Sequence, residues 1–296
     1  MKGYIMQLQP FSVNDGDGIR TTIFMAGCPL RCKWCSNPEG FTPEEKVGWY
    51  QRKCIGCGSC VSACPQGIDI DMNKRRADCI ACGRCVEACP EGSRAFMVTY
   101  RDADDIIREI HKHRLFYAYS GGGITFSGGE AASQPELLDY LSGQIYDLGY
   151  SMDIESCGYF DFDRVRPSLE RMDMIFMDLK MMDPDRHEFY TGVRNDRILD
   201  NIRKLADLDA EIVIRIPVIG GVNDDEDNIR SSAAYVHDNV PQAAMELLPY
   251  HRYGKIKYEA LGISYDHPEF FTPSREQMDH LRRIAADQGV RIADFR

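Results

Sequence analysis

Beyond about residue 98, the chain alternates short apolar runs with longer helix-like segments. Short apolar runs bounded by turn residues predict buried strands, and longer periodic segments predict helices. The predicted strands lie at 124–126, 152–155, 174–178, 212–218, 245–248 and 290–293, and the predicted helices lie near 102–115, 135–148, 197–208, 225–238 and 275–288. This alternation favours parallel strands covered by helices on the outside, joined by right-handed connections.

Glycines and charged residues follow two of the predicted strands directly. They form the runs Phe126-Ser127-Gly128-Gly129-Glu130 and Met177-Asp178-Leu179-Lys180. Active sites of parallel α/β folds form at the carboxyl ends of the strands. Because side chains alternate along a strand, Asp178 and Lys180 are expected on one face. The sequence therefore predicts a polar site at this edge of the sheet.

The first third of the chain has a different pattern. A polar loop at 14–18 precedes an apolar strand candidate at 21–25, which runs into a cysteine-containing loop. The segment 47–97 is rich in cysteine and glycine and lacks helical periodicity. We therefore expect three parts: 1–46 as the first part of the main fold, 47–97 as a small insert organised by its ligands, and 98–296 as the remainder.

Composition and charge narrow the possible functions. Hydrophobic residues make up 44% of the 296 residues, so a core can form without disulfides. The formal net charge of −11 disfavours binding to nucleic acid or to anionic membranes. The N-terminus lacks the apolar run of a signal peptide, and no stretch approaches the ~20 apolar residues of a membrane span. We expect a cytoplasmic protein, in which closely spaced cysteines bind metal more often than they form disulfides.

Eleven of the twelve cysteines fall between residues 28 and 89, and eight of these form two near-copies of one motif. Both copies read C-x2-C-x2-C-x3-C-P, the spacing of bacterial ferredoxins with two clusters, in which the fourth cysteine of each copy serves the other cluster. This spacing assigns Cys54, Cys57, Cys60 and Cys89 to one [4Fe–4S] cluster, and Cys79, Cys82, Cys85 and Cys64 to a second. Two structural zinc sites are the alternative, although this spacing is rare for zinc.

The remaining trio, Cys28, Cys32 and Cys35, has the spacing C-x3-C-x2-C and no fourth cysteine nearby. A cubane held by three thiolates leaves one iron with an open position, and open positions on metals are typical of catalytic sites. The twelfth cysteine, Cys157, follows a predicted strand, and we expect it to be a small buried residue rather than a ligand.

The trio, with Trp34 before its last cysteine, resembles the signature of the radical S-adenosylmethionine (SAM) superfamily. Other motifs resemble the activating enzymes of glycyl radical enzymes, in the same order along nearly the whole chain. They are 15–20 (Asp17 replaces a usual proline), 125–130 (followed by Ala131 in place of proline), 178–180, 190–193, 215–217, 221–224 and 248–251. The eight-cysteine insert resembles that of members with two additional ferredoxin-like clusters.

The resemblance implies a partial (β/α)6 TIM-like barrel with an inserted ferredoxin-like domain. It also implies reductive cleavage of SAM to a 5′-deoxyadenosyl radical, which abstracts hydrogen from a glycine of a partner glycyl radical enzyme. The implied cofactors are three [4Fe–4S] clusters and SAM, and compact relatives bind a monovalent cation where Glu155 and Ser156 stand here. No catalytic side chain beyond the cluster and SAM is expected.

The resemblance also places individual residues. Those expected to contact SAM are Trp34, Cys35, Ser36, Gly128, Gly129, Glu130, Asp178, Leu179, Lys180, Arg215 and His251. Asp15 and Arg20 are expected to contact the partner peptide. The implied partners are the glycine loop of a glycyl radical enzyme and a flavodoxin or ferredoxin as electron donor, with the chain itself a monomer.

Two alternative functions remain open from the residues. The first is a radical SAM enzyme with auxiliary clusters that modifies another peptide or a small molecule. The second is a plain ferredoxin-type electron carrier. That second alternative leaves the trio Cys28, Cys32 and Cys35 and the polar residues after the strands unexplained.

Overall fold

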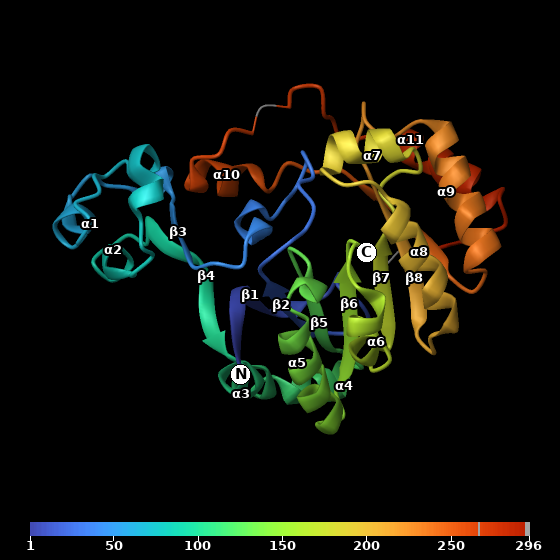
Figure 1. The fold of residues 1–296 in the computed structure, drawn as a ribbon, viewed down its shortest axis with the longest axis horizontal. Helices are drawn as coiled ribbons and strands as arrows, with labels where there is room; N and C mark the ends of the chain where they lie inside the picture. Colours follow the sequence, from blue (N-terminus) through green and yellow to red (C-terminus); the bar gives the residue numbers. More distant parts are fainter. Residues whose placement is uncertain (266, 294–296) are drawn as a thin grey trace.

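A single curved sheet organises the chain in the computed structural model, which describes residues 1–265 and 267–293 (Figure 1). Within these residues the sheet has ten strands in the order β10-β9-β8-β7-β6-β5-β2-β1-β4-β3. The strands are β1 (Lys2–Ser12), β2 (Arg20–Met25), β3 (Lys46–Trp49), β4 (Arg94–Asp102), β5 (Gly123–Gly128), β6 (Ser151–Ser156), β7 (Met174–Asp178), β8 (Glu211–Val218), β9 (Ala244–Pro249) and β10 (Arg291–Ile292).

Helices follow most of the strands in the second half of the chain. The helices of the described residues are α1 (Ser59–Ser62), α2 (Arg84–Glu87), α3 (Ala103–His111), α4 (Arg114–Ser120), α5 (Pro135–Asp147), α6 (Phe162–Leu169), α7 (Pro184–Thr191), α8 (Asp196–Lys204), α9 (Glu226–Asn239), α10 (Lys255–Leu261) and α11 (Arg275–Ala286). Helices α5, α6, α8 and α9 lie on the convex side of the sheet (Figure 1). Shorter 3-10 turns include Pro38–Phe41 and Ala131–Ser133.

The predicted parallel α/β architecture is confirmed. Strand β2 pairs in parallel with β5, and every neighbouring pair from β5 to β10 is also parallel. All the predicted strands are present. Those from 124–126 to 245–248 are apolar runs buried between the helices and the inside of the barrel, whereas the last one forms only the short and partly exposed β10. The segment predicted as one helix near 102–115 is instead two helices, since the backbone at His113 leaves the helical conformation.

Three strands that the sequence analysis missed extend the sheet on its other edge. Strand β1 pairs antiparallel with both β2 and β4, and β3 pairs antiparallel with β4. The sheet is therefore mixed rather than wholly parallel. Strand β4 crosses the expected boundary at residue 97, so the segment 47–97 is joined to the main sheet by paired strands.

The hydrophobic side chains form one large core and smaller satellites. The large core lies between the sheet and its helices, and includes Phe126, Leu138 and Ile214, none of which is exposed. A satellite in the insert surrounds Val47, Trp49, Ile68 and Met72 and contacts several of its cysteines. The insert projects from the barrel at the end that carries α1 and α2 (Figure 1). Among the described residues, every helix is too short or too polar to traverse a lipid bilayer.

Candidate active site

The loop that carries Cys28, Cys32 and Cys35 follows β2 and is held by the last residues of α7. The Arg31 amide donates to the Thr191 carbonyl at 2.7 Å, and the Lys33 amide donates to the Tyr190 carbonyl at 3.0 Å. Trp34 is buried in a satellite core with Met181, Ile219, Val222, Tyr250 and Phe270. The motif 190–193 therefore fixes the cysteine loop in place.

The three cysteines meet the ends of the parallel strands in one open cavity of about 270 Å³. The cavity is lined by Cys28, Leu30, Cys32, Trp34, Cys35, Ser36, Asn37, Ser127, Gly128, Gly129, Glu155, Ser156, Cys157, Asp178, Lys180, Arg215, Pro217 and Leu248. Eight of the residues predicted to contact SAM are among them: Trp34, Cys35, Ser36, Gly128, Gly129, Asp178, Lys180 and Arg215.

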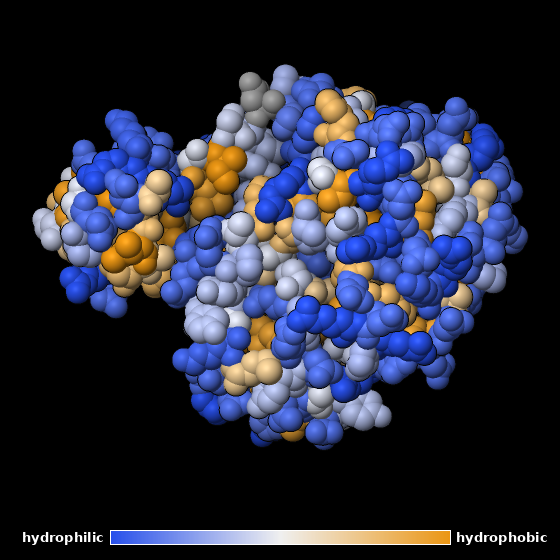
Figure 2. All heavy atoms as spheres, viewed as in Figure 1, coloured by the Kyte–Doolittle hydropathy of each residue, from blue (hydrophilic) through white to orange (hydrophobic). Residues whose placement is uncertain are grey.

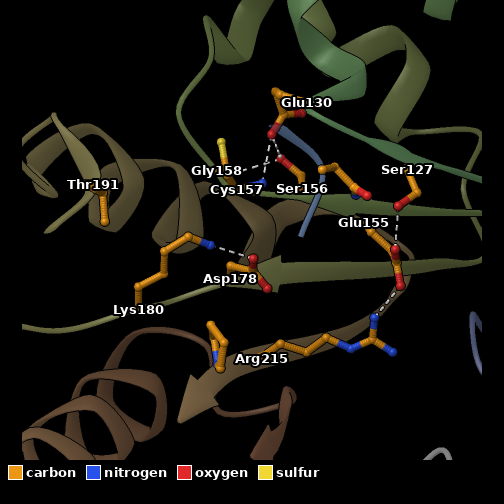
Figure 3. Close-up of polar contacts among 12 residues, drawn as sticks. Ser127, Glu130, Glu155, Ser156, Cys157, Gly158, Asp178, Lys180, Thr191 and Arg215 are labelled. Atoms are coloured by element: carbon orange, nitrogen blue, oxygen red, sulfur yellow. Dashed lines mark hydrogen bonds and ion pairs between the residues drawn. The ribbon is translucent and has the colours of Figure 1, made fainter. Parts of the chain in front are cut away.

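Asp178 and Lys180 form an ion pair at the end of β7, in which the lysine is buried and the aspartate is half-buried (Figure 3). The Lys180 Nζ lies 2.5 Å from the Asp178 Oδ2, and Lys180 is only 5% exposed. Although burial disfavours the ammonium, Asp178 and Cys32 raise the pKa of Lys180 above its ordinary value. The Asn223 side chain also donates to the Lys180 carbonyl at 2.6 Å. The pair is thus a fixed part of the cavity wall and not a solvated surface pair.

A second charged network crosses the ends of β6, β8 and β9. The Arg215 Nη1 donates to the Glu155 Oε1 at 2.5 Å, and the Arg215 Nε donates to the Glu246 Oε2 at 2.7 Å. The Ser127 hydroxyl donates to the other Glu155 oxygen at 2.5 Å (Figure 3). Although burial opposes the charged form, the two carboxylates raise the pKa of Arg215. The guanidinium of Arg215 therefore supplies the positive charge beside Glu155.

Glu130, which was predicted to contact SAM, is not among the residues that line the cavity. Its carboxylate is 1% exposed and accepts from the Cys157 amide at 2.7 Å, the Ser156 hydroxyl at 2.9 Å and the Ala132 amide at 3.0 Å (Figure 3). Burial raises the pKa of Glu130, and these hydrogen bonds oppose the shift. The side chain therefore fixes the end of β6 against the turn after β5.

Two other expected SAM contacts also lie outside this cavity. Leu179 is fully buried in the large core, because its side chain points away from Asp178 and Lys180. His251 is exposed after β9, and its ring stacks on Tyr253 with centroids 4.5 Å apart. Leu248, near the end of β9, lines the cavity instead.

The glycine pair after β5 is required by the chain's own packing. Gly128 has a φ of +118°, and a Cβ there would lie 2.3 Å from the Met25 carbonyl oxygen. A Cβ on Gly129 would lie 2.6 Å from the Gly27 carbonyl oxygen. The nearest obstacles to a side chain at both positions are therefore backbone atoms of the segment that leads into the cysteine loop.

Three residues of the cavity wall were missed as ligand contacts by sequence reasoning. Asn37 donates from its side chain to the Gly128 carbonyl at 3.0 Å and so ties the cysteine loop to the glycine turn. Ser127 orients Glu155, as described above. Cys157 is buried as expected, but its thiol also lies against that of Cys28. Their positions in the sequence could have indicated Ser127 and Cys157, because both residues lie at the ends of neighbouring parallel strands.

The two residues expected to contact a peptide lie at the opposite end of the strands. Arg20 is 1% exposed, lies 3.1 Å from the Asp153 carboxylate, and donates to the Thr125 hydroxyl and the Ile124 carbonyl at 2.7 Å each. Asp15 accepts from the Thr22 hydroxyl at 2.6 Å. Both side chains brace the base of the sheet, and the buried Arg20 has no face for a peptide.

We expect the ion pair of Arg20 and Asp153 to make the stability of the folded protein depend on pH. Burial raises the pKa of Asp153 to about 7, against the opposing effect of Arg20. Because the folded protein holds this proton more tightly than the unfolded chain, the stabilisation is fully present below the unfolded pKa and is lost as pH rises through about 7. We expect the Tm of the natural protein to fall relative to that of Asp153→Asn between about pH 4 and pH 7, and the difference to level off at higher pH. The exposed control Asp147→Asn should keep a constant difference in Tm, and a constant difference for Asp153→Asn would contradict the assignment.

The insert brings each predicted set of four cysteines to a cavity of its own. One cavity is lined by Cys54, Cys57, Cys60 and Cys89. The other is lined by Cys64, Cys79, Cys82 and Cys85, with Cys60 also reaching it. The two sequence repeats share their local geometry, since Gly58 and Gly83 adopt φ values of +76° and +77° just before α1 and α2.

Comparison with known proteins shows which family the chain resembles. Residues 22–232 match the model of the radical SAM superfamily. The chain is 37% identical to the (2S)-3-sulfopropanediol dehydratase activating enzyme of Klebsiella oxytoca, over 96% of this chain and 93% of that protein. It is 39% identical to the trans-4-hydroxy-L-proline dehydratase activating enzyme of Clostridioides difficile, over 96% of each.

A solved structure shares the fold at low sequence identity. The radical SAM methyltransferase from Sphaerobacter thermophilus superposes with a TM-score of 0.53 and 12% identity, covering 98% of this chain and 76% of that one. The match over residues 22–232 and the two full-length relatives place the chain within one family. This chain belongs to the radical SAM superfamily and, within it, to the activating enzymes of glycyl radical enzymes.

Proposed function

We propose that the open cavity binds a [4Fe–4S] cluster through Cys28, Cys32 and Cys35, with SAM beside it, and that the chain activates a glycyl radical enzyme. The observation that carries this is the meeting of three cysteines with Asp178 and Lys180 in a single cavity. Burial raises the pKa of Cys35 to about 12, so its thiolate form needs a cationic partner such as iron. The donor set therefore fits the group.

The chain's own residues position and protect the reacting groups. When bound, the cluster and SAM supply the one-electron chemistry that yields the 5′-deoxyadenosyl radical. The Lys180 ammonium is placed to hold the SAM carboxylate, while the Asp178 carboxylate is placed to accept from ribose hydroxyls. Trp34 and its buried apolar neighbours close one side of the cavity and exclude water from the radical.

For the insert we propose two further [4Fe–4S] clusters that relay electrons to the cavity. Support comes from the two cavities, each lined by one predicted set of four cysteines. The exposed apolar residues of the insert include Ile55 and Ile80, and Figure 2 shows apolar side chains on its surface. This surface suits a flavodoxin or ferredoxin as electron donor. About twelve iron atoms per chain are expected after anaerobic reconstitution; two or three zinc atoms instead would falsify the assignment.

We propose that the partner's glycine loop enters through a neighbouring groove. This second cavity adjoins the first, since Ser36 and Asn37 line both. Its other lining residues include Phe24 from β2, Phe96 from β4 and Tyr253 after β9. A peptide lying there would bring its backbone next to the loop that carries Cys35.

Replacing Tyr253 tests this groove. Tyr253 is 81% exposed at the rim, and aromatic residues of this kind dominate many protein interfaces. We expect Tyr253→Ala to raise the KM for the partner enzyme by about 5–30-fold, as a loss of ~1–2 kcal/mol implies, with a smaller change in kcat. The matched control is Tyr119→Ala, which removes an 89% exposed tyrosine from α4. Equal KM values for the two variants would exclude this groove.

The test of the proposed function is anaerobic turnover with dithionite, SAM and a candidate glycyl radical enzyme. Release of 5′-deoxyadenosine together with a glycine-centred doublet in the EPR spectrum of the partner is the expected result. Release of 5′-deoxyadenosine without any radical on a panel of such partners would favour a different peptide or small-molecule substrate. No release from a preparation with full iron content would favour an electron carrier.

A further inference from the structure

Arg94, the first residue of β4, lies between the two cysteine-lined cavities of the insert. It lines both of them, and it is the one charged residue among the described residues that does so. Its side chain is almost completely buried, with 4% of the residue exposed. A buried positive charge shared by two candidate metal-cluster sites needs a physical explanation, because buried charges are normally paired.

The contacts of Arg94 provide acceptors for only some of the N–H donors of its guanidinium. The Nη2 atom donates to the carbonyl oxygens of Asp69, at 3.3 Å, and of Ile70, and it lies 3.8 Å from the Cys60 sulfur. The guanidinium carbon lies 5.3 Å from the ring centroid of Trp49. The Nη1 atom is buried and has no hydrogen-bond partner.

No carboxylate balances this charge within the part of the chain that the structure describes, since Arg94 takes part in none of its ion pairs. An arginine keeps its charge even when buried, so neutralisation by loss of a proton is not available. An anionic group that fills the cavities would supply both the missing counter-charge and the missing acceptor for Nη1.

We propose that Arg94 is the shared counter-ion of the two auxiliary clusters and that it raises the reduction potentials of both. This inference rests on the proposed assignment of those clusters. A cubane with four thiolate ligands is anionic and gains one further negative charge on reduction. A fixed guanidinium beside it, and an N–H donor directed at its sulfur atoms, stabilise the reduced form more than the oxidised form. Arg94 is thus a positioning and tuning residue rather than a catalytic one.

An EPR-monitored redox titration of Arg94→Gln in the full-length, reconstituted protein tests the proposal. We expect the equilibrium constant for one-electron reduction of each auxiliary cluster to fall at least tenfold, a shift of about 59 mV to more negative potential. The matched control is Arg84→Gln, which removes the same charge from an exposed position on α2. Water and salt screen that charge, so its removal should leave both potentials unchanged.

Unchanged potentials in an Arg94→Gln protein with full iron content would overturn the proposal, as would equal shifts in the two variants. If Arg94→Gln does not assemble its clusters, Arg94→Met removes the charge and leaves no unpaired amide in its place. Lowered potentials of the auxiliary clusters in that variant support the proposal, and unchanged potentials overturn it. Failure of the cluster assignment itself is distinguishable, because the natural protein would then hold about four iron atoms instead of about twelve.

Discussion

Cys32→Ala is expected to form no detectable 5′-deoxyadenosine with SAM and dithionite. Cys32 stands at the centre of the cysteine loop, where burial and its neighbours Cys28 and Cys35 raise the pKa of its thiol. A cubane held by only two thiolates of this loop loses its anchoring, and the iron content should fall from about twelve to about eight atoms per chain. The EPR signals of the auxiliary clusters should persist, which would show that the insert remains folded.

Cys157→Ala is the matched control for this experiment. Cys157 lines the same cavity and its thiol lies against that of Cys28, so the variant removes a sulfur from the same wall. In our account Cys157 is not a ligand, and the variant should keep its full iron content and its cleavage of SAM. Loss of the cavity's cluster in Cys157→Ala would mean that four thiolates, not three, hold it.

Arg215→Met should lower the stability of the protein by about 3–5 kcal/mol. The substitution leaves Glu155 and the 3% exposed Glu246 without their shared cation, and an uncompensated buried charge costs this much. It also removes the guanidinium from its place 3.5 Å from the ring centroid of Phe176. At roughly 2–4 °C per kcal/mol for a chain of this order of size, the Tm should drop by on the order of ten degrees.

Arg203→Met is the control for the effect on stability. Arg203 pairs with Asp200 at 2.9 Å on the surface of α8, where both side chains are about half exposed. Such pairs contribute ~0–1 kcal/mol, so the Tm should change by no more than a few degrees. Similar losses in the two variants would contradict the assignment of Arg215 to a buried network.

The parallel part of the fold could be predicted from the sequence because its strands are buried on both faces. The run 174–178, for example, is apolar up to Asp178, and the structure forms β7 over the same residues. Strand β1 could not be predicted in this way. It lies at the transition to the antiparallel edge, and its polar residues Gln7 and Gln9 line the open groove. Long-range pairing with β4, and not local pattern, defines this edge.

Motifs indicated which residues gather at the cavity, but not where each side chain points. Asp178 and Lys180 face the cavity as the alternation of side chains predicts, and the same rule turns Leu179 into the core. The turn after β5 rotates Glu130 into a hydrogen-bonded position behind the wall. Nothing in the local sequence of Arg94 indicated that it lines both cavities, because Cys79, Cys82 and Cys85 of the second cavity reach it only through the folded insert.

The most direct measurement is electron–nuclear double resonance on the reduced protein with SAM that carries an isotopic label on its amino nitrogen. Strong coupling between the labelled nitrogen and the cluster, retained in Cys157→Ala, is the predicted outcome, since it requires an iron free of protein ligands. A cluster signal without such coupling, in a sample shown to contain bound SAM, would contradict the whole account.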